Sequence, residues 1–431
     1  MRSTLLASAA ALLFTAAPAF AQSYGSSAPQ TPPATALPST RTTAAAAAAP
    51  AAPALCSMKL SGGARKALVE YQAANTAKDA ARIATATAAA TAAAKSGDDK
   101  CVLGQLMLKA AAEKEDYAAA SAAVDLMVNS GVANPVALGP IAISVGNKRL
   151  ALKDYAGASA TLDQAMRLSP NDPAAFVLAA QAKGKLNQTA ASLDLFSKAF
   201  ALRKATGQPI DETWLRAAVQ ASYDAKSPKT YALTREWVSA YPAVKNWRDS
   251  LRIYQVMSGQ TTSELVDIYR LQRANKALMG EADYVNYAVA VLQKGYPGEA
   301  KAVLSEGIAA GSISASSLSV GPILAQATAK AAGDRAGLDG LAKAAAASAD
   351  GKKAVGIADA YYGYGDYAKA AALYRAALTK SGTDLPTANL RLGMALTMAG
   401  DKAGAKAALA AVTGPKAEIA QYWMTYLALR A

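Results

Sequence analysis

Short breaks rich in Gly, Asp, Asn and Pro recur along the chain from about residue 64, and between them apolar residues follow helical spacing. No segment shows the alternation typical of a strand. Typical breaks are LSPNDP at 168–173, KGYPGE at 294–299, AAGD at 331–334 and YGYGD at 362–366. Neighbouring breaks are often about half of 34 residues apart, which indicates internal repeats built from helices alone.

One skeleton of four positions recurs in these helices. It starts with a small residue. A second small residue follows 12 positions later, a large apolar residue 16 positions later, and a further small residue 19 positions later. The clearest copies begin at Gly146, Ala180, Ala288, Ala358 and Gly393. Small residues let two helices approach closely, and the large residue fills the remaining gap. We therefore expect Gly393 to lie against a neighbouring helix with no room for a side chain, and Gly363 to lie in a loop.

These offsets, together with the turn Gly365-Asp366-Tyr367 and the closing Pro170, resemble the tetratricopeptide repeat, a helix-turn-helix unit of 34 residues. The resemblance implies an all-α fold in which antiparallel helix pairs stack as a right-handed superhelix. It also implies a repeat domain over 56–431 that ends in a capping helix at 418–431. The expected units lie near 64–97, 101–132, 139–172, 173–206, 211–244, 245–280, 281–314, 318–350, 351–384 and 386–417.

The N-terminus predicts export. Residues 1–21 resemble a signal peptide, with Arg2 before an apolar stretch and a small-x-small cleavage site at 19–21. The alternative is an N-terminal membrane anchor; no other segment is expected to span a membrane. Residues 22–55 are rich in Pro and Ala and predict a disordered linker. We expect a periplasmic protein.

The residue types present restrict the chemistry. The chain has no His, which excludes a Ser-His-Asp triad, a Cys-His pair and any His-ligated metal. No phosphate-binding or nucleophile-elbow motif occurs in a suitable context. We expect no enzymatic activity, no cofactor and no metal.

Cys56 and Cys101 are the only cysteines. An exported chain meets an oxidising compartment, and an even count suits pairing. In the array implied by the resemblance, the first helices of adjacent units lie parallel, so their N-terminal ends are neighbours. We therefore expect a Cys56–Cys101 disulfide that staples the first unit; the alternative is two buried, reduced cysteines.

The resemblance also implies a binding surface. In tetratricopeptide proteins the first helix of each pair lines a concave groove that often holds an extended peptide. The residues expected to face such a groove here are Asn147, Gln181, Asn286 and Arg391. The family's basic clamp for a carboxylate is not assembled in consecutive units of this sequence.

Aromatic residues gather between Trp214 and Tyr254, with Trp237 and Trp247 among them. We interpret the tryptophans as core filling, and an aromatic groove for a peptide or glycan is the alternative. A basic run, Arg270, Arg273 and Lys276, lies on one helical face and is accompanied by nearby acidic residues. We interpret this run as a solvated face, with a patch for anionic lipid or polymer as the alternative.

The chain is therefore expected to be a periplasmic scaffold for protein–protein interaction, in envelope assembly or polysaccharide export. Its formal net charge of +14 keeps a second hypothesis open, a binding module for an anionic envelope polymer or lipid surface. Nucleic acid is not an expected partner, because the chain is predicted to be exported.

Overall fold

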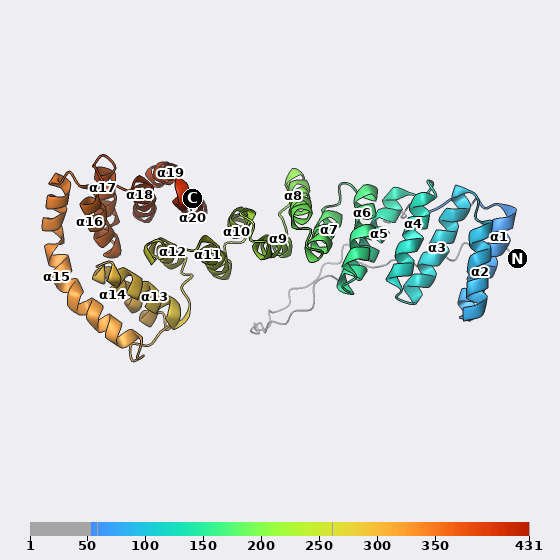
Figure 1. Ribbon diagram of the computed structural model, residues 1–431, viewed down its shortest axis with the longest axis horizontal. Helices are drawn as coiled ribbons and strands as arrows, with labels where there is room; N and C mark the ends of the chain where they lie inside the picture. Colours follow the sequence, from blue (N-terminus) through green and yellow to red (C-terminus); the bar gives the residue numbers. More distant parts are fainter. Residues whose placement is uncertain (1–52, 58, 261, 431) are drawn as a thin grey trace, which may run out of the picture. The chain divides into compact units, whose positions relative to one another are not determined.

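The computed structural model describes residues 53–57, 59–260 and 262–430 (Figure 1). The expected signal peptide at 1–21 and residues 22–52 of the expected linker lie outside the described residues. In the described part no helix is both long and apolar enough to cross a bilayer.

Nine helix pairs account for most of the described chain, and consecutive helices pack on one another throughout. The first five pairs are α1 (Gly62–Ala77) with α2 (Ala80–Ala93), α3 (Gly97–Glu113) with α4 (Tyr117–Asn129), α5 (Pro135–Ala151) with α6 (Tyr155–Leu168), α7 (Pro173–Lys185) with α8 (Thr189–Ala205), and α9 (Glu212–Asp224) with α10 (Lys229–Ala240). The other four are α11 (Val244–Ser258) with α12 (Thr262–Ala274), α13 (Gly280–Gln293) with α14 (Pro297–Ala309), α16 (Gly351–Gly363) with α17 (Tyr367–Ala377), and α18 (Leu385–Ala399) with α19 (Lys402–Ala410). The expected all-α array of helix pairs is confirmed.

Every pair turns at a residue with positive φ. The first five pairs use side-chain-bearing residues there, and the last four use glycine. These positions are Lys78, Glu115, Lys153, Asn187, Lys226, Gly259, Gly295, Gly365 and Gly400. An aspartate next to the turn often caps the second helix, as Asp154 does by accepting the backbone N–H of Gly157 at 3.0 Å. The Gly400-Asp401 turn is a helix end followed by an N-cap, in which Asp401 accepts the backbone N–H of Gly404 at 2.9 Å.

The small and large positions of the repeated skeleton form the contact inside each pair. A Cβ atom on Gly146 would lie 2.5 Å from Cγ of Leu162, and one on Gly393 would lie 2.5 Å from Cγ of Leu409. The two contacts share the same offset, so the same joint is built twice, and the expected crowding at Gly393 is confirmed. In the pair α7–α8 the joint also includes a hydrogen bond from the Ser192 hydroxyl to the Ala180 carbonyl at 2.7 Å.

Gly393→Leu should lower the free energy of unfolding by roughly 1–3 kcal/mol, because its side chain would force α18 and α19 apart. The measurement is the midpoint of urea denaturation. Gly333→Leu is the matched control, since Gly333 is exposed on a helix and its added Cβ meets nothing within 4 Å. An equal loss for both variants would show that helix packing at Gly393 is not the cause.

The eighth expected unit, 318–350, is wrong. Instead of a pair it contains one helix of 28 residues, α15 (Val320–Ala347), which runs through the expected break at 331–334. Gly333 does not adopt positive φ there, and alanine is the commonest residue of this helix, so good helix formers outweigh its glycines. The 3₁₀ turn η2 (Gly414–Lys416) and α20 (Ala417–Ala428) follow the ninth pair.

The loop position expected for Gly363 is also wrong. Gly363 is the last residue of α16, and a Cβ there would lie 2.7 Å from Cβ of Glu299 on α14. Its φ is not positive, so the glycine is needed for close packing between helices rather than for backbone freedom.

The helices α10 to α20 form an unbroken series of contacts that returns to its beginning, because α20 packs against α10 and α12 (Figure 1). We call this segment, Lys229–Ala428, the C-terminal ring. The hydroxyl of Tyr426 donates to the carbonyl of Ala274 at 3.0 Å, and the Tyr422 hydroxyl lies 2.5 Å from that of Thr234. The stack expected from the sequence did not include this closure.

Candidate protein-interaction surfaces

Two of the four expected groove residues lie at equivalent places on neighbouring first helices. Asn147 on α5 follows Gly146, and Gln181 on α7 follows Ala180, 34 residues further on. The helices α5 and α7 contact each other. Both amide side chains are half-buried, and neither makes a hydrogen bond within the described part of the chain. They are therefore free to bind another chain.

The other two expected groove residues lie elsewhere. Asn286 is exposed on α13, in the C-terminal ring. Arg391 on α18 is only 6% exposed, and it forms ion pairs with Asp267 and Asp359. The four residues therefore do not make one surface, and Arg391 is not available to a ligand.

The tryptophans mainly fill the core, as we interpreted them. Trp237 and Trp247 are buried. Trp214 is half-buried, with the guanidinium of Arg203 4.9 Å from its ring centre.

Two tyrosines of the same sequence region instead line a cleft of about 670 Å³ between the end of α9, the start of α10 and the end of α11. The lining residues are Tyr223, Asp224, Lys226, Pro228, Tyr231, Val256 and Met257. Val256 is 62% exposed and so lies open to solvent. Both tyrosines fall within the aromatic region between Trp214 and Tyr254, but sequence reasoning missed Pro228, Val256 and Met257, because α11 approaches this turn only through helix packing.

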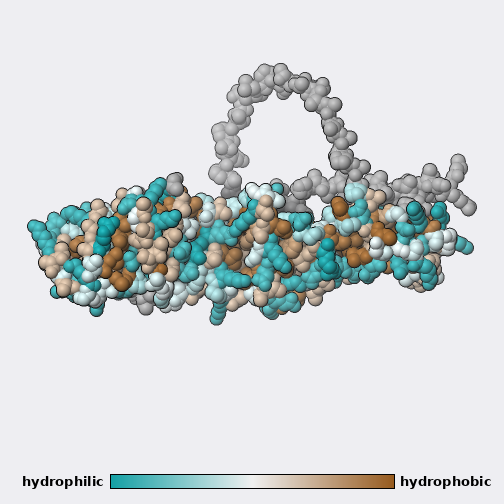
Figure 2. Space-filling view, turned by 90° about the horizontal axis from the view of Figure 1, so that it is seen from above, coloured by the Kyte–Doolittle hydropathy of each residue, from teal (hydrophilic) through white to brown (hydrophobic). Residues whose placement is uncertain are grey.

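Apolar side chains on the surface of this molecule are scattered over several helices. In the face that Figure 2 shows, hydrophilic residues separate small hydrophobic patches. Large exposed apolar side chains include Val136 on α5 and Val256 on α11, which belong to different helix pairs. Isolated apolar residues are normal on a protein surface, so the cleft rather than exposure alone marks Val256.

The solvated face expected for the basic run is wrong for Arg270. Arg270 is 2% exposed, and its guanidinium makes two hydrogen bonds to Glu299, at 2.8 and 2.7 Å. Arg273 donates a hydrogen bond of 2.8 Å to Glu306, and of the three residues only Lys276 is exposed. Arg270 differs from Arg273 because its acidic partners, Glu299 and Asp359, are themselves buried, whereas the Glu306 side chain is 54% exposed.

Arg270 belongs to a buried chain of alternating charges in the C-terminal ring. It also binds Asp359 on α16 at 2.9 Å, and Asp359 binds Arg391 at 2.6 Å. Arg391 continues to Asp267 on α12 at 3.0 Å, and Lys416 lies 3.4 Å beyond. Three cations thus meet three carboxylates, so this buried cluster carries no net charge.

Three tyrosines complete the cluster. The hydroxyl of Tyr287 donates to Glu299 at 2.6 Å, while Tyr374 and Tyr296 donate to Asp359 at 2.6 and 3.0 Å. Burial opposes ionisation of Asp359, but Arg391, Arg270 and the Tyr374 hydrogen bond outweigh it and hold the pKa of the carboxyl below its ordinary value. Burial and the charge of Asp359 raise the pKa of Tyr374 well above its usual range. The tyrosines therefore stay neutral donors.

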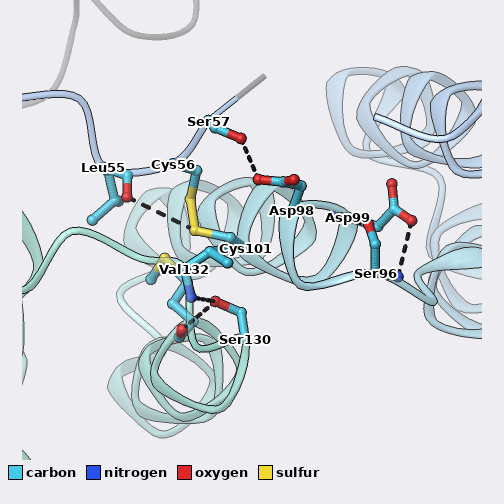
Figure 3. The surroundings of a disulfide bond; sticks show 10 residues. Leu55, Cys56, Ser57, Ser96, Asp98, Asp99, Cys101, Ser130 and Val132 are labelled. Carbon is cyan, nitrogen blue, oxygen red and sulfur yellow. Dashed lines mark hydrogen bonds between the residues drawn. A yellow bond between two sulfur atoms is a disulfide. The ribbon is translucent and has the colours of Figure 1, made fainter. Parts of the chain in front are cut away.

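The structure joins Cys56 and Cys101 by a disulfide, with their Cα atoms 5.8 Å apart (Figure 3). The residues before α1 thereby lie against the start of α3. The backbone N–H of Asn134 donates to the carbonyl of Leu55 at 2.9 Å, and Ser57 points to Asp98. Residues 55–57 thus reach the N-terminal ends of both α3 and α5.

Asp99 joins the starts of α1 and α3 next to the disulfide. Its carboxylate accepts the backbone N–H and the hydroxyl of Ser61, both at 3.0 Å, and the backbone N–H of Ser96 at 3.2 Å. Burial opposes the charge, but these hydrogen bonds prevail and lower the pKa of Asp99 to about 2.

Because the folded pKa of Asp99 is below its unfolded value, the ionised carboxylate stabilises the fold above about pH 4. That contribution should disappear as the pH falls from about 4 to 2. We expect Asp99→Asn to lower the melting temperature at pH 7 and the difference from the unmodified chain to shrink toward pH 2. A difference that stays constant over this pH range would contradict the role of the charge.

The sequence matches no family model, and no curated protein matches it either. A search of solved structures finds matches at low identity. A tetratricopeptide repeat protein from Parabacteroides merdae is 12% identical, over 67% of this chain and 96% of that chain, with a TM-score of 0.30. A chain of the APC/C hetero-tetramer Cut9-Hcn1 is also 12% identical, over 81% of this chain and 86% of that chain, with a TM-score of 0.17.

No group of three or more carboxylate or thiol side chains is placed to hold a metal ion in the part of the chain that the structure describes. Two surfaces with unused binding capacity are the α5–α7 amide pair and the α9–α11 cleft. Both present hydrogen-bonding groups beside apolar side chains, an arrangement that suits a polypeptide ligand.

Proposed function

We propose that this chain is a periplasmic scaffold that holds a protein partner, in envelope assembly or polysaccharide export. The observation that carries the proposal is the placement of Asn147 and Gln181 at equivalent positions on adjacent first helices, without partners of their own among the described residues. Export is supported by the signal-like N-terminus and by the disulfide, because disulfides persist in oxidising compartments.

The chemistry of the two amides suits an extended backbone. A carboxamide offers both donors and acceptors, so it can bind a peptide N–H and C=O together. Ile143 lies one helical turn before Asn147 and is half-buried, which adds an apolar contact on the same helix. Repeating such a position every 34 residues gives a row of contacts matched to an elongated partner.

Photocrosslinking tests this surface. A photoreactive amino acid replaces Asn147, or Gln181, in the full chain expressed in a bacterium. We expect each to form an adduct of discrete mass that excess unmodified protein competes away. The control position is Ala160, which is exposed on α6, the second helix of the same pair as α5. Equal crosslinking from Ala160 would overturn the assignment to the first helices.

An anionic polymer or lipid surface is the competing partner, and the same preparation distinguishes it. Binding driven by charge weakens steeply as salt is added, whereas contacts from amide and apolar groups depend on salt only weakly. Adducts that resist protease, and that do not form when the sample is irradiated at high salt, would favour the polymer. Fractionation of the cells checks the location: the folded protein should be released with the periplasm.

A further inference from the structure

The α9–α11 cleft has the size of a ligand site and a donor-rich lining. Its volume of about 670 Å³ falls within the range in which proteins bind small ligands and peptide segments. Its apolar lining includes Pro228, Val256 and Met257, while Tyr223 and Tyr231 present aromatic surfaces. The hydroxyls of both tyrosines make no hydrogen bond within the described chain.

Among the lining side chains of the cleft that make no hydrogen bond, hydrogen-bond donors outnumber carboxylate acceptors. Two phenol hydroxyls and the Lys226 ammonium can donate, and Lys226 has no ion-pair partner in the described residues. Asp224 is the only carboxylate in the lining, and one of its two oxygens, Oδ1, already accepts a hydrogen bond from Gln220 at 2.6 Å. A well-matched ligand therefore offers carbonyl oxygens and few N–H groups.

The charge of the cleft further restricts the class of ligand that fits it. Asp224 and Lys226 balance each other, so the lining carries no net charge and does not favour a polyanion. Proline-rich chain meets each requirement. It lacks the N–H at every proline, exposes its carbonyls in the extended polyproline conformation, and packs its rings on aromatic side chains.

We propose that the α9–α11 cleft binds an uncharged, proline-rich segment of a partner protein, with Tyr223 and Tyr231 donating to its carbonyls. This inference rests on the proposed role in protein binding, but it uses a surface separate from Asn147 and Gln181. The partner's segment would lie in the cleft with its proline rings against the tyrosines, Pro228 and Val256.

Fluorescence anisotropy on the full chain tests the proposal. The probe is a labelled peptide of five Ala-Pro repeats with blocked ends. One comparison peptide has serine in place of every proline, and the other is poly-glutamate. We expect saturable binding of the proline peptide, at least tenfold tighter than that of the serine peptide, and no cleft-dependent binding of poly-glutamate.

Matched variants localise the binding. Val256→Lys should weaken binding more than tenfold, because it replaces an apolar lining residue by a charged one. Val136→Lys is the control, since Val136 is 71% exposed on α5, far along the chain from the cleft. Tyr223→Phe and Tyr231→Phe keep the rings, and each should weaken binding about threefold to tenfold through the lost hydroxyl. Circular dichroism should show unchanged folding for all four variants.

Three outcomes would overturn the proposal: equal affinity for the proline and serine peptides, equal effects of Val256→Lys and Val136→Lys, or binding of poly-glutamate alone. Crosslinking from Asn147 and Gln181 distinguishes a failure of the cleft proposal from a failure of the proposed scaffold function. If those adducts persist while the proline peptide does not bind, the scaffold role stands and the cleft assignment is rejected.

Discussion

Replacing Arg270 by methionine should lower the free energy of unfolding by roughly 3–5 kcal/mol. The substitution keeps an unbranched side chain of similar length but removes the cation between Glu299 and Asp359. Both carboxylates are almost completely buried, at 0% and 1% exposure, so water cannot replace the lost partner. Asp359 keeps Arg391, whereas Glu299 keeps only the hydroxyl of Tyr287. Denaturation with urea, followed by tryptophan fluorescence, measures the loss.

Arg273→Met is the matched control for this prediction. Arg273 lies on the same helix and pairs with Glu306, whose side chain is 54% exposed. Exposed ion pairs contribute about 1 kcal/mol or less, so the control should have a small effect. A second variant, Arg270→Met with Glu299→Gln, should recover part of the loss because it removes the unpaired charge as well. Equal effects of Arg270→Met and Arg273→Met would show that the buried cluster does not stabilise the ring.

Removing the disulfide should have the next largest effect. The bond closes a loop with a sequence separation of 45 residues, and the chain-entropy model gives such a loop a stabilisation of up to about 4 kcal/mol. The pair α1–α2 has a neighbouring pair on one side only, so the loss should concentrate there. We expect the double variant Cys56→Ser, Cys101→Ser to be cleaved within 62–93 at protease concentrations that leave the unmodified chain intact.

The position of the tryptophans provides an internal control for the disulfide. All four lie at or beyond residue 214, so their fluorescence reports on α9 and the C-terminal ring but not on α1–α2. Far-UV circular dichroism should show an early loss of helix in the double variant, while the tryptophan transition stays in place. Two free thiols in the unfolded, non-reduced protein would contradict the bond itself, and a simultaneous shift of both signals would contradict its local action.

Much of the fold follows from local sequence because each helix pair solves the same packing problem within about 34 residues. Gly146 and Gly393 show this most clearly, since a Cβ atom added to either would lie 2.5 Å from Cγ of the leucine 16 positions later. The local pattern predicted a helix pair at 318–350 wrongly, because Gly333 in this alanine-rich segment resembles a turn but does not adopt positive φ. A turn requires positive φ, and composition alone does not reveal which glycine adopts it.

The closure of the C-terminal ring was beyond sequence reasoning. Arg391 and Asp267 are 124 residues apart, and Arg270 and Asp359 are 89 apart, so neither pairing leaves a helical-spacing signal. On its own helix, Arg270 looks like part of a solvated face and Arg391 was expected to face a groove, so neither residue suggested a buried ion pair. The disulfide was easier to predict, because two cysteines allow a single intramolecular pairing. The α5–α7 amides came from the family resemblance, and their binding role stays a prediction.

A double-mutant cycle between Asp267 and Arg391 tests whether α12 and α18 meet in the ring. The single variants are Asp267→Asn and Arg391→Met, the double variant combines them, and urea denaturation gives the free energy of unfolding of each. Direct contact predicts a coupling energy within about 0.5–3 kcal/mol, because each substitution removes the same interaction. Additive effects, with a coupling of about zero, would show that α12 and α18 do not meet and that the C-terminal helices remain an open stack.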